Sequence, residues 1–472
     1  MIATNANNSH GYLATLLAVV GGVCTLCSLN SEAADNLGWS DVSRIEAQIQ
    51  PPRFESSEFD ITSFGAKYNG KSDSLAAITK AISACHHAGG GQVIVPAGQW
   101  FVAGPIHLKS NVSLHLQEGA VVKFSTNPDD FLPLVQTRFE GTELQNFSPL
   151  IYAFEQENIA ITGNGTFDGQ AGPGNWWNWK GHWGDQSDTG WQKGDPDQRK
   201  DVSRLGELAD EGIPSRERMF GSGHYLRPNF IQFYRCQNIL IEGVTFKNSP
   251  MWVIHPVLST NVTIRDITVD SHGPNNDGCD PESCRFVLIE DCYFDTGDDC
   301  IAIKSGRNAD GRRLDIPSEN IIIRNCTMKD GHGGVVLGSE MSGGIRNVFV
   351  EDCQMSSPNL ERAIRLKSNS KRGGYLENLF VRNIEVGEVS DAVVRINLKY
   401  WGESGEFPPM VSNVYLENVT AKKCKYPLYL VGLSESPIKN IQLKDCTFNN
   451  ANMPSVIEHV ESMFFSDVSQ PR

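Results

Sequence analysis

Four short motifs hold the residue types most able to do chemistry in this sequence of 472 residues. They are Asn275-Asn276-Asp277, Gly297-Asp298-Asp299, Gly331-His332-Gly333 and Arg365-Leu366-Lys367. Three carboxylates held close together cannot all ionise freely, so one of them can keep a proton near neutral pH. A protonated carboxyl beside an ionised one is the pair that cleaves a glycosidic bond. The motifs therefore predict acid–base hydrolysis of a sugar chain, provided that the fold brings them together.

The basic residues of these motifs fit the same chemistry. Arg365 and Lys367 flank one leucine, so in a strand both side chains point the same way and can bind an anion such as a sugar carboxylate. His332 stands between two glycines and can orient or tune a carboxylate. Each motif alone also has a plain structural explanation, such as a turn or a calcium-ligand pair for Asp298-Asp299. Only the four together, in order along the chain, indicate a site.

A repeated unit supplies the scaffold for these motifs. The unit reads Asn, apolar, any, apolar, any, Asn/Asp/Gly, small apolar or Cys, any, apolar. It begins at Asn158, Asn238, Asn261, Asn320, Asn347, Asn378, Asn413 and Asn440, and at Arg285 with arginine in place of asparagine. Periods of this length indicate a solenoid, and the apolar–polar alternation indicates two short strands joined by a bend. The fold class we predict is all-β, a parallel β-helix. A propeller, which needs longer repeats, is the alternative.

Similar offsets from the repeat anchors put the four motifs on one face of that solenoid. Asp277, Asp298, Asp299, His332, Arg365 and Lys367 follow their repeat anchors by 12 to 20 residues. Neighbouring coils of a β-helix lie about 4.8 Å apart. The carboxylates are therefore expected on adjacent coils, with the histidine and the two cations beside them.

The ends of the solenoid and one interruption set the expected boundaries. Leu75, Ile78, Ile82 and Cys85 have helical spacing, and Ser72 can cap their helix over the N-terminal end. We expect a lead-in at 34–58, a β-helix domain at 59–460 and a tail at 461–472. An insertion at about 170–230 carries Trp176, Trp177, Trp179, Trp183 and Trp191. It is either functional or an ordered decoration of the outer face.

The N-terminus and the cysteines bear on the cell compartment. The apolar stretch 11–26 and the small residues at Ser31 and Ala33 indicate a signal peptide over 1–33, hence a secreted protein, periplasmic or extracellular. No Lys or Arg precedes that stretch, so a membrane anchor or a wrongly assigned start is the alternative. Ten cysteines follow the leader, and we expect four of them to stack as a buried ladder: Cys292, Cys326, Cys353 and Cys446. Cys279/Cys284 and Cys292/Cys300 are also spaced for local disulfides, and no spacing fits a zinc site.

The net charge of −15 bears on the partner. It argues against nucleic acid or an anionic membrane as the main partner. It would also argue against an acidic polymer, but a few cations in a cleft can bind one despite the global charge. We expect no cofactor and no metal, and a monomer.

The four motifs resemble those of glycoside hydrolase family 28, the polygalacturonases, whose hallmarks are N-T-D, G/Q-D-D, G-H-G and R-I-K. The resemblance spans about residues 59–450, with Asn276 in place of Thr and Leu366 in place of Ile. It implies a right-handed parallel β-helix and single-displacement hydrolysis with inversion. By the same resemblance Asp298 is the general acid, and Asp277 and Asp299 activate the water. His332 supports the acid, and Arg365 and Lys367 bind substrate.

Within the family the sequence looks most like bacterial exo-acting members, because the Trp-rich insertion is followed by His224-Tyr225-Leu226-Arg227-Pro228. A wall at one end of the cleft would leave only a chain terminus in the site, and Arg227 could hold the terminal carboxylate. Further binding candidates are Asn275, Lys304 and Tyr400. The predicted substrate is α-1,4-linked galacturonic acid in pectin, polygalacturonate or oligogalacturonides. Rhamnogalacturonan or xylogalacturonan hydrolysis, a calcium-dependent pectate lyase and a non-catalytic carbohydrate-binding β-helix are the alternatives.

Overall fold

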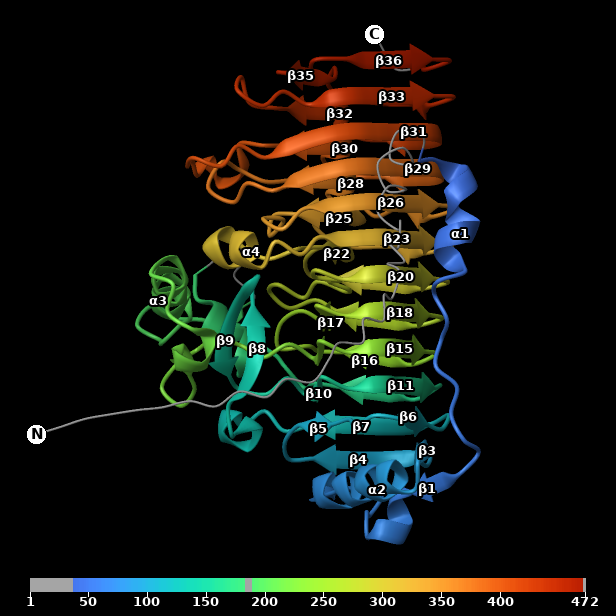
Figure 1. Cartoon of the computed structure of the whole chain (residues 1–472), viewed down its shortest axis with the longest axis vertical. Helices are drawn as coiled ribbons and strands as arrows, with labels where there is room; N and C mark the ends of the chain where they lie inside the picture. Colours follow the sequence, from blue (N-terminus) through green and yellow to red (C-terminus); the bar gives the residue numbers. More distant parts are fainter. Residues whose placement is uncertain (1–36, 183–188, 470–472) are drawn as a thin grey trace, which may run out of the picture. The chain divides into compact units, whose positions relative to one another are not determined.

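Parallel strand pairing dominates the computed structural model, which describes residues 37–182 and 189–469. Every strand pair among these residues is parallel except β8 (Val135–Phe139) with β9 (Thr142–Asn146). Figure 1 shows the strands stacked coil upon coil in sequence order, and described residues from Gly38 onward belong to one compact unit. Crossovers between parallel strands are right-handed. The predicted all-β, right-handed parallel β-helix is therefore confirmed.

Two faces of the coils form the largest sheet, which has 23 strands in the described chain. Each repeat unit supplies one strand, a bend, and a second strand. The members are β1 (Glu58–Asp60), β2 (Asn69–Asp73), β3 (Gly91–Val95), β4 (Gly98–Val102), β6 (Val112–Leu116), β7 (Ala120–Phe124), β11 (Glu157–Gly163), β12 (Thr166–Asp168), β15 (Gln237–Glu242), β16 (Thr245–Lys247), β18 (Thr260–Arg265), β19 (Thr268–Ser271), β20 (Arg285–Glu290), β21 (Tyr293–Thr296), β23 (Ser318–Arg324), β24 (Thr327–Met328), β26 (Ile345–Glu351), β27 (Gln354–Met355), β29 (Tyr375–Glu388), β31 (Met410–Lys423), β33 (Lys439–Lys444), β34 (Thr447–Phe448) and β36 (Met463–Ser466).

The third face of the coils carries two further sheets. One comprises β5 (Ile106–His107), β10 (Ile151–Phe154), β14 (Ile231–Tyr234) and β17 (Ile254–Val257). The other comprises β22 (Ile301–Ile303), β25 (Val335–Gly338), β28 (Arg362–Lys367), β30 (Ala392–Asn397), β32 (Tyr426–Val431) and β35 (Val456–Glu458). Single bridges at Cys279 and Glu282 connect β17 to this second sheet. The candidate site lies over that junction.

An asparagine ladder explains why the repeat unit starts with Asn. Each anchor adopts a left-handed backbone, a conformation that Asn tolerates better than most residues. Where two consecutive anchors are asparagines, the Nδ2 of the second donates to the Oδ1 of the first, as from Asn378 to Asn347 (3.0 Å) and from Asn413 to Asn378 (2.9 Å). The assignment of Arg285 as an anchor was wrong. Phe286 has the left-handed φ of 59° and aligns with the asparagines, because Val287 pairs with Val262.

The N-terminal cap is the helix α2 (Leu75–His87), as predicted, but Ser72 does not cap it. Ser72 lies within β2, the N-cap residue is Ser74, and the Asp73 carboxylate accepts from the backbone N–H of Leu75. The buried face of the helix consists of Ala77, Ile78, Ala81, Ile82 and Cys85, with Leu75 half-buried. These side chains join the core that continues through the coils.

The two predicted flanks are more ordered than expected. A short helical segment, η1 (Trp39–Asp41) and α1 (Val42–Glu46), packs beside β20 and β23 and is fixed by an ion pair from Glu46 to Arg324 (2.7 Å). At the other end, β36 pairs with β33, so the predicted tail at 461–472 begins with another strand of the β-helix. The open edge of β33 accounts for this extension, because its backbone groups need partners. The predicted signal peptide at 1–33 lies outside the described residues.

The buried cysteine ladder is confirmed for three consecutive coils. Cys292, Cys326 and Cys353 hold the same position on successive coils, and each thiol donates to the backbone carbonyl two residues before it. Ile384 and Val419 hold the same position on the next two coils and separate Cys446 from that stack. The ten cysteines in the described part of the chain are buried and free, so the two local disulfides considered from spacing do not form.

The insertion and the hairpin β8–β9 form a lobe beside the coils (Figure 1). Its elements are η4 (Trp176–Lys180), α3 (Arg199–Asp210), η6 (Ser215–Glu217) and β13 (Met219–Phe220), which pairs with β9. Nearby, α4 (Asn308–Leu314) contacts α3. The remaining short helical turns are η2 (Ile61–Phe64), η3 (Pro128–Phe131) and η7 (Tyr400–Gly402). None of the described helices is long and apolar enough to cross a membrane.

Candidate active site

The four sequence motifs meet on neighbouring coils of the third face. Cys279, Ile301, Val335 and Ile364 align in register across four coils. Asp277 and Asp299 each stand two residues before their aligned partners, and His332 stands three before Val335. Arg365 and Lys367 lie on β28 itself. Carboxylate oxygens of Asp277, Asp298 and Asp299 lie within 4.8 Å of one another. The predicted clustering of the carboxylates is therefore observed.

A cavity of about 900 Å³ opens over this cluster. Asp277, Asp298 and His332 line its floor, and Arg365 and Lys367 line it beside them. Asp299 is fully buried and is not among the lining residues. Toward one end of the axis the lining comes from the insertion: Lys180, His182, Gln198, Arg199 and Val202. Toward the other end it comes from Tyr400, Trp401 and Glu403.

Asp299 is held by both cations of the Arg365-Leu366-Lys367 motif. Lys367 Nζ lies 2.6 Å from its Oδ2 and Arg365 Nη1 lies 3.2 Å from its Oδ1. Burial alone would raise the pKa of Asp299, but the charges of Lys367 and Arg365 outweigh it and hold that pKa below its usual range. Tyr400 lies over the same pair, with its ring centroid 5.7 Å from the Arg365 guanidinium and 5.6 Å from Lys367 Nζ. Asp299 is thus ionised and fixed in place.

Asp298 and His332 form a second ion pair that faces the cavity. His332 Nδ1 lies 2.8 Å from Asp298 Oδ1, which also accepts from the backbone N–H of Asp299. Burial opposes ionisation of Asp298, but the charge and hydrogen bond of His332, together with Lys367 and Arg365, hold its pKa well below the usual range. The carboxylate of Asp298 in turn raises the pKa of His332. In the free site the pair therefore holds one proton, which is on the imidazole.

Asp277 has the opposite tendency. Burial, followed by the charges of Asp298 and Asp280, raises its pKa well above the usual range. Lys304 Nζ lies 3.5 Å from Asp277 Oδ2 and 3.5 Å from Asp280 Oδ1. The carboxyl that keeps a proton in the free site thus belongs to the Asp277–Asp280 pair, whereas the family resemblance assigns the acid role to Asp298.

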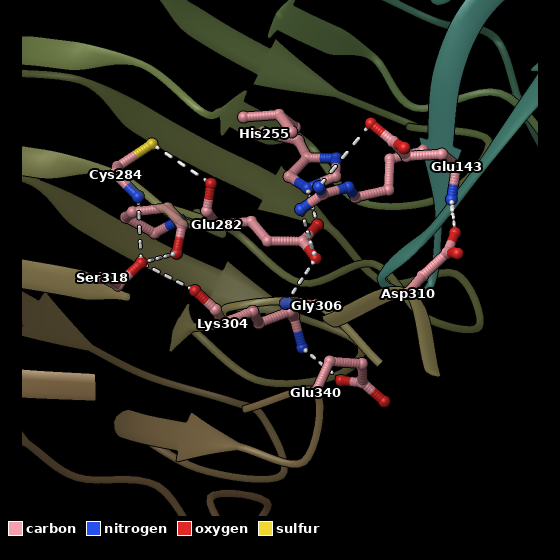
Figure 2. A network of polar contacts seen from close by, with 12 residues as sticks. Glu143, His255, Glu282, Cys284, Lys304, Gly306, Asp310, Ser318 and Glu340 are labelled. Atoms are coloured by element: carbon pink, nitrogen blue, oxygen red, sulfur yellow. Dashed lines mark hydrogen bonds and ion pairs between the residues drawn. The ribbon is translucent and has the colours of Figure 1, made fainter. Parts of the chain in front are cut away.

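Lys304 is the cation at the centre of this region. Its side chain is buried, contacts Glu340 at 3.3 Å, and lies 4.4 Å from the ring centroid of Trp252. Figure 2 shows the polar network behind it, where Glu282 accepts from the backbone N–H of Gly306 and from His255. Because the neighbouring carboxylates favour the charged ammonium, the pKa of Lys304 is raised despite burial. Lys304 therefore lines the site as predicted, with its charge directed at carboxylates of the protein.

Arg227 is not among the residues that line the cavity, and its contact with a terminal carboxylate stays a prediction. Its guanidinium is buried and donates to the carbonyl oxygens of Pro250 (2.9 Å) and Pro274 (2.6 Å), and to Asn275 Oδ1 (2.7 Å). The Asn275 side chain, which does line the cavity, is positioned by this contact. Sequence spacing cannot show whether an arginine faces a cavity or the protein behind it.

The insertion contributes polar residues to the cavity and uses its tryptophans for packing. Trp176 is buried against Trp179, with ring centroids 4.9 Å apart, and Trp177 Nε1 donates to the carbonyl of Ser249. Trp191 lies 5.2 Å from the guanidinium of Arg199. Trp183 lies outside the described residues. Both interpretations of the insertion thus hold in part, because it is packed through its tryptophans and lines the site through other side chains.

Comparison with known proteins identifies the family. Residues 221–465 match the family model for glycosyl hydrolases family 28. A Vitis vinifera protein named "Probable polygalacturonase" is 30% identical over 83% of this chain and 74% of its own length. The chain belongs to glycosyl hydrolases family 28. Residues 59–123 also match the model named rhamnogalacturonase A/epimerase, pectate lyase-like.

Two bacterial relatives of this family 28 protein carry exo-acting names. The crystal structure of a hyperthermoactive exopolygalacturonase from Thermotoga maritima is 47% identical, covers 90% of this chain and 96% of that one, and superposes with a TM-score of 0.86. An exo-poly-alpha-D-galacturonosidase of Dickeya chrysanthemi is 26% identical over 84% of this chain and 67% of its own length.

The family 28 site also contains residues that the motifs did not reveal. Asp280 follows Asp277 by three residues, so the motif itself could have pointed to it. Glu340, Lys180 and Trp252 come from other coils or from the insertion, and no local pattern marks them. The three clustered carboxylates lie close enough to hold a metal ion, as do His272, Asp295 and Asp330 outside the cavity. In the first cluster Lys304, Lys367 and Arg365 already supply positive charge.

Proposed function

We propose that this protein is an exo-acting polygalacturonase that hydrolyses α-1,4-linked galacturonic acid from one end of the chain, with inversion. The single observation that carries the proposal is the cavity in which Asp277, Asp298 and His332 stand beside Arg365 and Lys367. Acid–base carboxyls next to two cations suit a substrate whose sugar ring carries a carboxylate. A pectic polysaccharide or oligogalacturonide is accordingly the proposed partner.

In the proposed reaction water attacks the anomeric carbon as the bond to the leaving oxygen breaks. Asp298 gives its proton to that oxygen, and Asp277, with the ionised Asp299 behind it, accepts a proton from the water. Arg365 and Lys367 bind the carboxylate of the sugar whose bond is cleaved. His332 supplies the donated proton to Asp298 through their 2.8 Å contact and takes another from solvent before the next turnover. The proton held by Asp277 leaves to solvent before the next turnover.

Bound substrate allows Asp298 to act as an acid. Lys367 and Arg365 are among the groups that keep the pKa of Asp298 low in the free site. A sugar carboxylate bound to these two cations offsets their charge, so the pKa of Asp298 rises when substrate is present. The proton on His332 then moves to Asp298. The acid is thus formed only in the complex.

The insertion supports the exo-acting part of the proposal. Lys180, Gln198 and Arg199 line the cavity from a lobe that stands beside the coils, as a wall at one end requires (Figure 1). The same mode of action is named for the Thermotoga maritima relative, which is 47% identical. We also propose that the protein is exported, because the apolar stretch 11–26 is typical of a signal peptide. N-terminal sequencing of protein recovered from the culture medium or periplasm would test the cleavage.

Digestion of polygalacturonate and of defined oligogalacturonides tests the function. We expect monomer or dimer from the earliest times, new reducing ends and, by NMR, initial products of inverted anomeric configuration. A ladder of oligomers at early times would refute exo action, and products that absorb in the ultraviolet would indicate a lyase. If rhamnogalacturonan or xylogalacturonan were hydrolysed faster than polygalacturonate, that polysaccharide would be assigned as the substrate instead. Asp298→Asn should lower kcat about 10²- to 10⁴-fold, whereas unchanged turnover would refute the site.

A further inference from the structure

Asp280 is a buried carboxylate next to the site that the proposed reaction does not use. It has no exposed surface, and neither of its oxygens has a hydrogen-bond donor among the described residues. Among the described residues its ion-pair partner is Lys304, whose Nζ lies 3.5 Å from its Oδ1. A buried, ionised carboxylate without donors is strongly destabilising, so Asp280 is expected to bind a proton or to share one.

That proton can be shared with Asp277. Lys304 Nζ lies 3.5 Å from a carboxylate oxygen of each aspartate, so one positive charge faces two carboxyl groups. Asp277 Oδ1 is also buried without a donor. A hydrogen bond between the two carboxyls satisfies both, but only when one of them is protonated. With one shared proton, the two carboxyl groups carry a single negative charge, which the ammonium of Lys304 neutralises.

The two carboxyls differ in what they face. Asp277 lines the cavity, whereas Asp280 is not among the lining residues. A base that accepts a proton from water must be ionised and exposed to that water. We propose that Asp280 is a positioning residue that holds the proton shared with Asp277, leaving the cavity-facing carboxylate ionised to act as the base of the proposed hydrolysis.

The surrounding charges support this division. Asp280 faces Lys304, Asp277, Asp299 and Asp298. Burial raises its pKa well above the usual range and the charges of Asp299 and Asp298 add to this, whereas Lys304 and Asp277 lower it. Because Asp298 and Asp299 are both held ionised by cations, any further negative charge at Asp280 is unfavourable. Protonated Asp280 also donates to Asp277, which stabilises the ionised base.

Asp280→Asn tests the role, since the amide can donate to Asp277 permanently. We expect activity at the pH optimum to stay within about threefold and the acidic limb of the kcat/KM profile to stay within about half a pH unit, because the amide replaces one neutral donor by another. Asp280→Leu, which offers no donor to the ionised Asp277, should move that limb up by about one pH unit or more. The control is Glu351→Gln, which neutralises a buried carboxylate paired with Arg382 on another face and should leave the profile unchanged. A limb that moves down in Asp280→Asn would show that Asp280 is the ionised partner and would overturn the proposal, as would an unmoved limb in Asp280→Leu or a folded Asp280→Asn variant inactive at every pH.

A second measurement covers the case in which the variant does not fold. In the substrate-free wild-type protein, infrared difference spectra between neutral and alkaline pH should show the C=O stretch of a protonated carboxyl at neutral pH. No such band would overturn the sharing of a proton. This readout does not depend on substrate, so it separates this inference from the proposed function, on which the kinetic test rests. If the wild type does not hydrolyse galacturonan but shows the band, only the proposed function fails.

Discussion

Replacement of Arg227 by methionine would separate a positioning role from substrate binding. Methionine fills similar space but donates nothing, so the carbonyls of Pro250 and Pro274 and the side chain of Asn275 would each lose a buried donor. An unsatisfied buried acceptor costs about 1–3 kcal/mol. With partial relaxation, we expect the free energy of unfolding to fall by about 3–5 kcal/mol. Because Asn275 lines the cavity, kcat/KM should fall as well.

Urea denaturation and steady-state kinetics on oligogalacturonides would measure the two effects together. The control is Arg235→Met, since Arg235 is half exposed and its Nη1 lies 3.7 Å from the carboxylate of Glu155. Such a surface pair contributes at most about 1 kcal/mol, so little change is expected. If Arg227→Met unfolded like the wild type and raised only the KM, Arg227 would bind substrate directly. The argument from its buried contacts would then be wrong.

Three further predictions concern the ion pairs and the ladder. Since Asp298 raises the pKa of His332, the stability that this pair contributes is complete below the ordinary imidazole pKa and is lost as pH rises through the raised value. Activity should have its alkaline limb above the ordinary value, and an NMR titration of His332 at or below that value would contradict this. Lys367→Met should lower the free energy of unfolding by about 2–4 kcal/mol and raise KM at least tenfold, because it leaves Asp299 with Arg365 as its remaining close cation. Lys367→Arg is the matched control, and an unchanged KM in the methionine variant would refute the role. Asn378→Ala should destabilise by about 1–2 kcal/mol more than Asn378→Gly, because its φ of 62° strains any residue with a Cβ, and equal urea midpoints would refute that account.

The repeat and the motifs could be predicted because both depend on local sequence. Alternating apolar residues set the strands, and an asparagine with a left-handed backbone sets each bend. Similar offsets from these anchors place Asp277, Asp298 and His332 on one face without any knowledge of long-range contacts. In the repeat that has no asparagine, the predicted anchor, Arg285, is one residue too early. Phe286 has the left-handed backbone there, and a phenylalanine gives no sequence signal for that conformation.

Long-range contacts were not predictable in the same way. Arg227 was expected in the cavity, yet acceptors on Pro250, Pro274, Asn275 and Gln198 hold it behind the cavity lining. The link between Lys304 and Asp280 was equally hidden, since a lysine gives no sign of its partner in a sequence. Likewise, the tryptophans of the insertion suit either packing or sugar stacking, and only their neighbours decide which.

By itself the sequence determined which residues share a face, because strand periodicity and coil length are properties of the chain. It also determined the chemistry available there: carboxyls, an imidazole and two cations. The tertiary structure decided where the protons lie. The pKa of each carboxyl depends on burial and on charges brought from several coils, so Asp298 is ionised by His332, Lys367 and Arg365, whereas the Asp277–Asp280 pair keeps a proton. Ionisation is set by distances in space, which no local pattern contains.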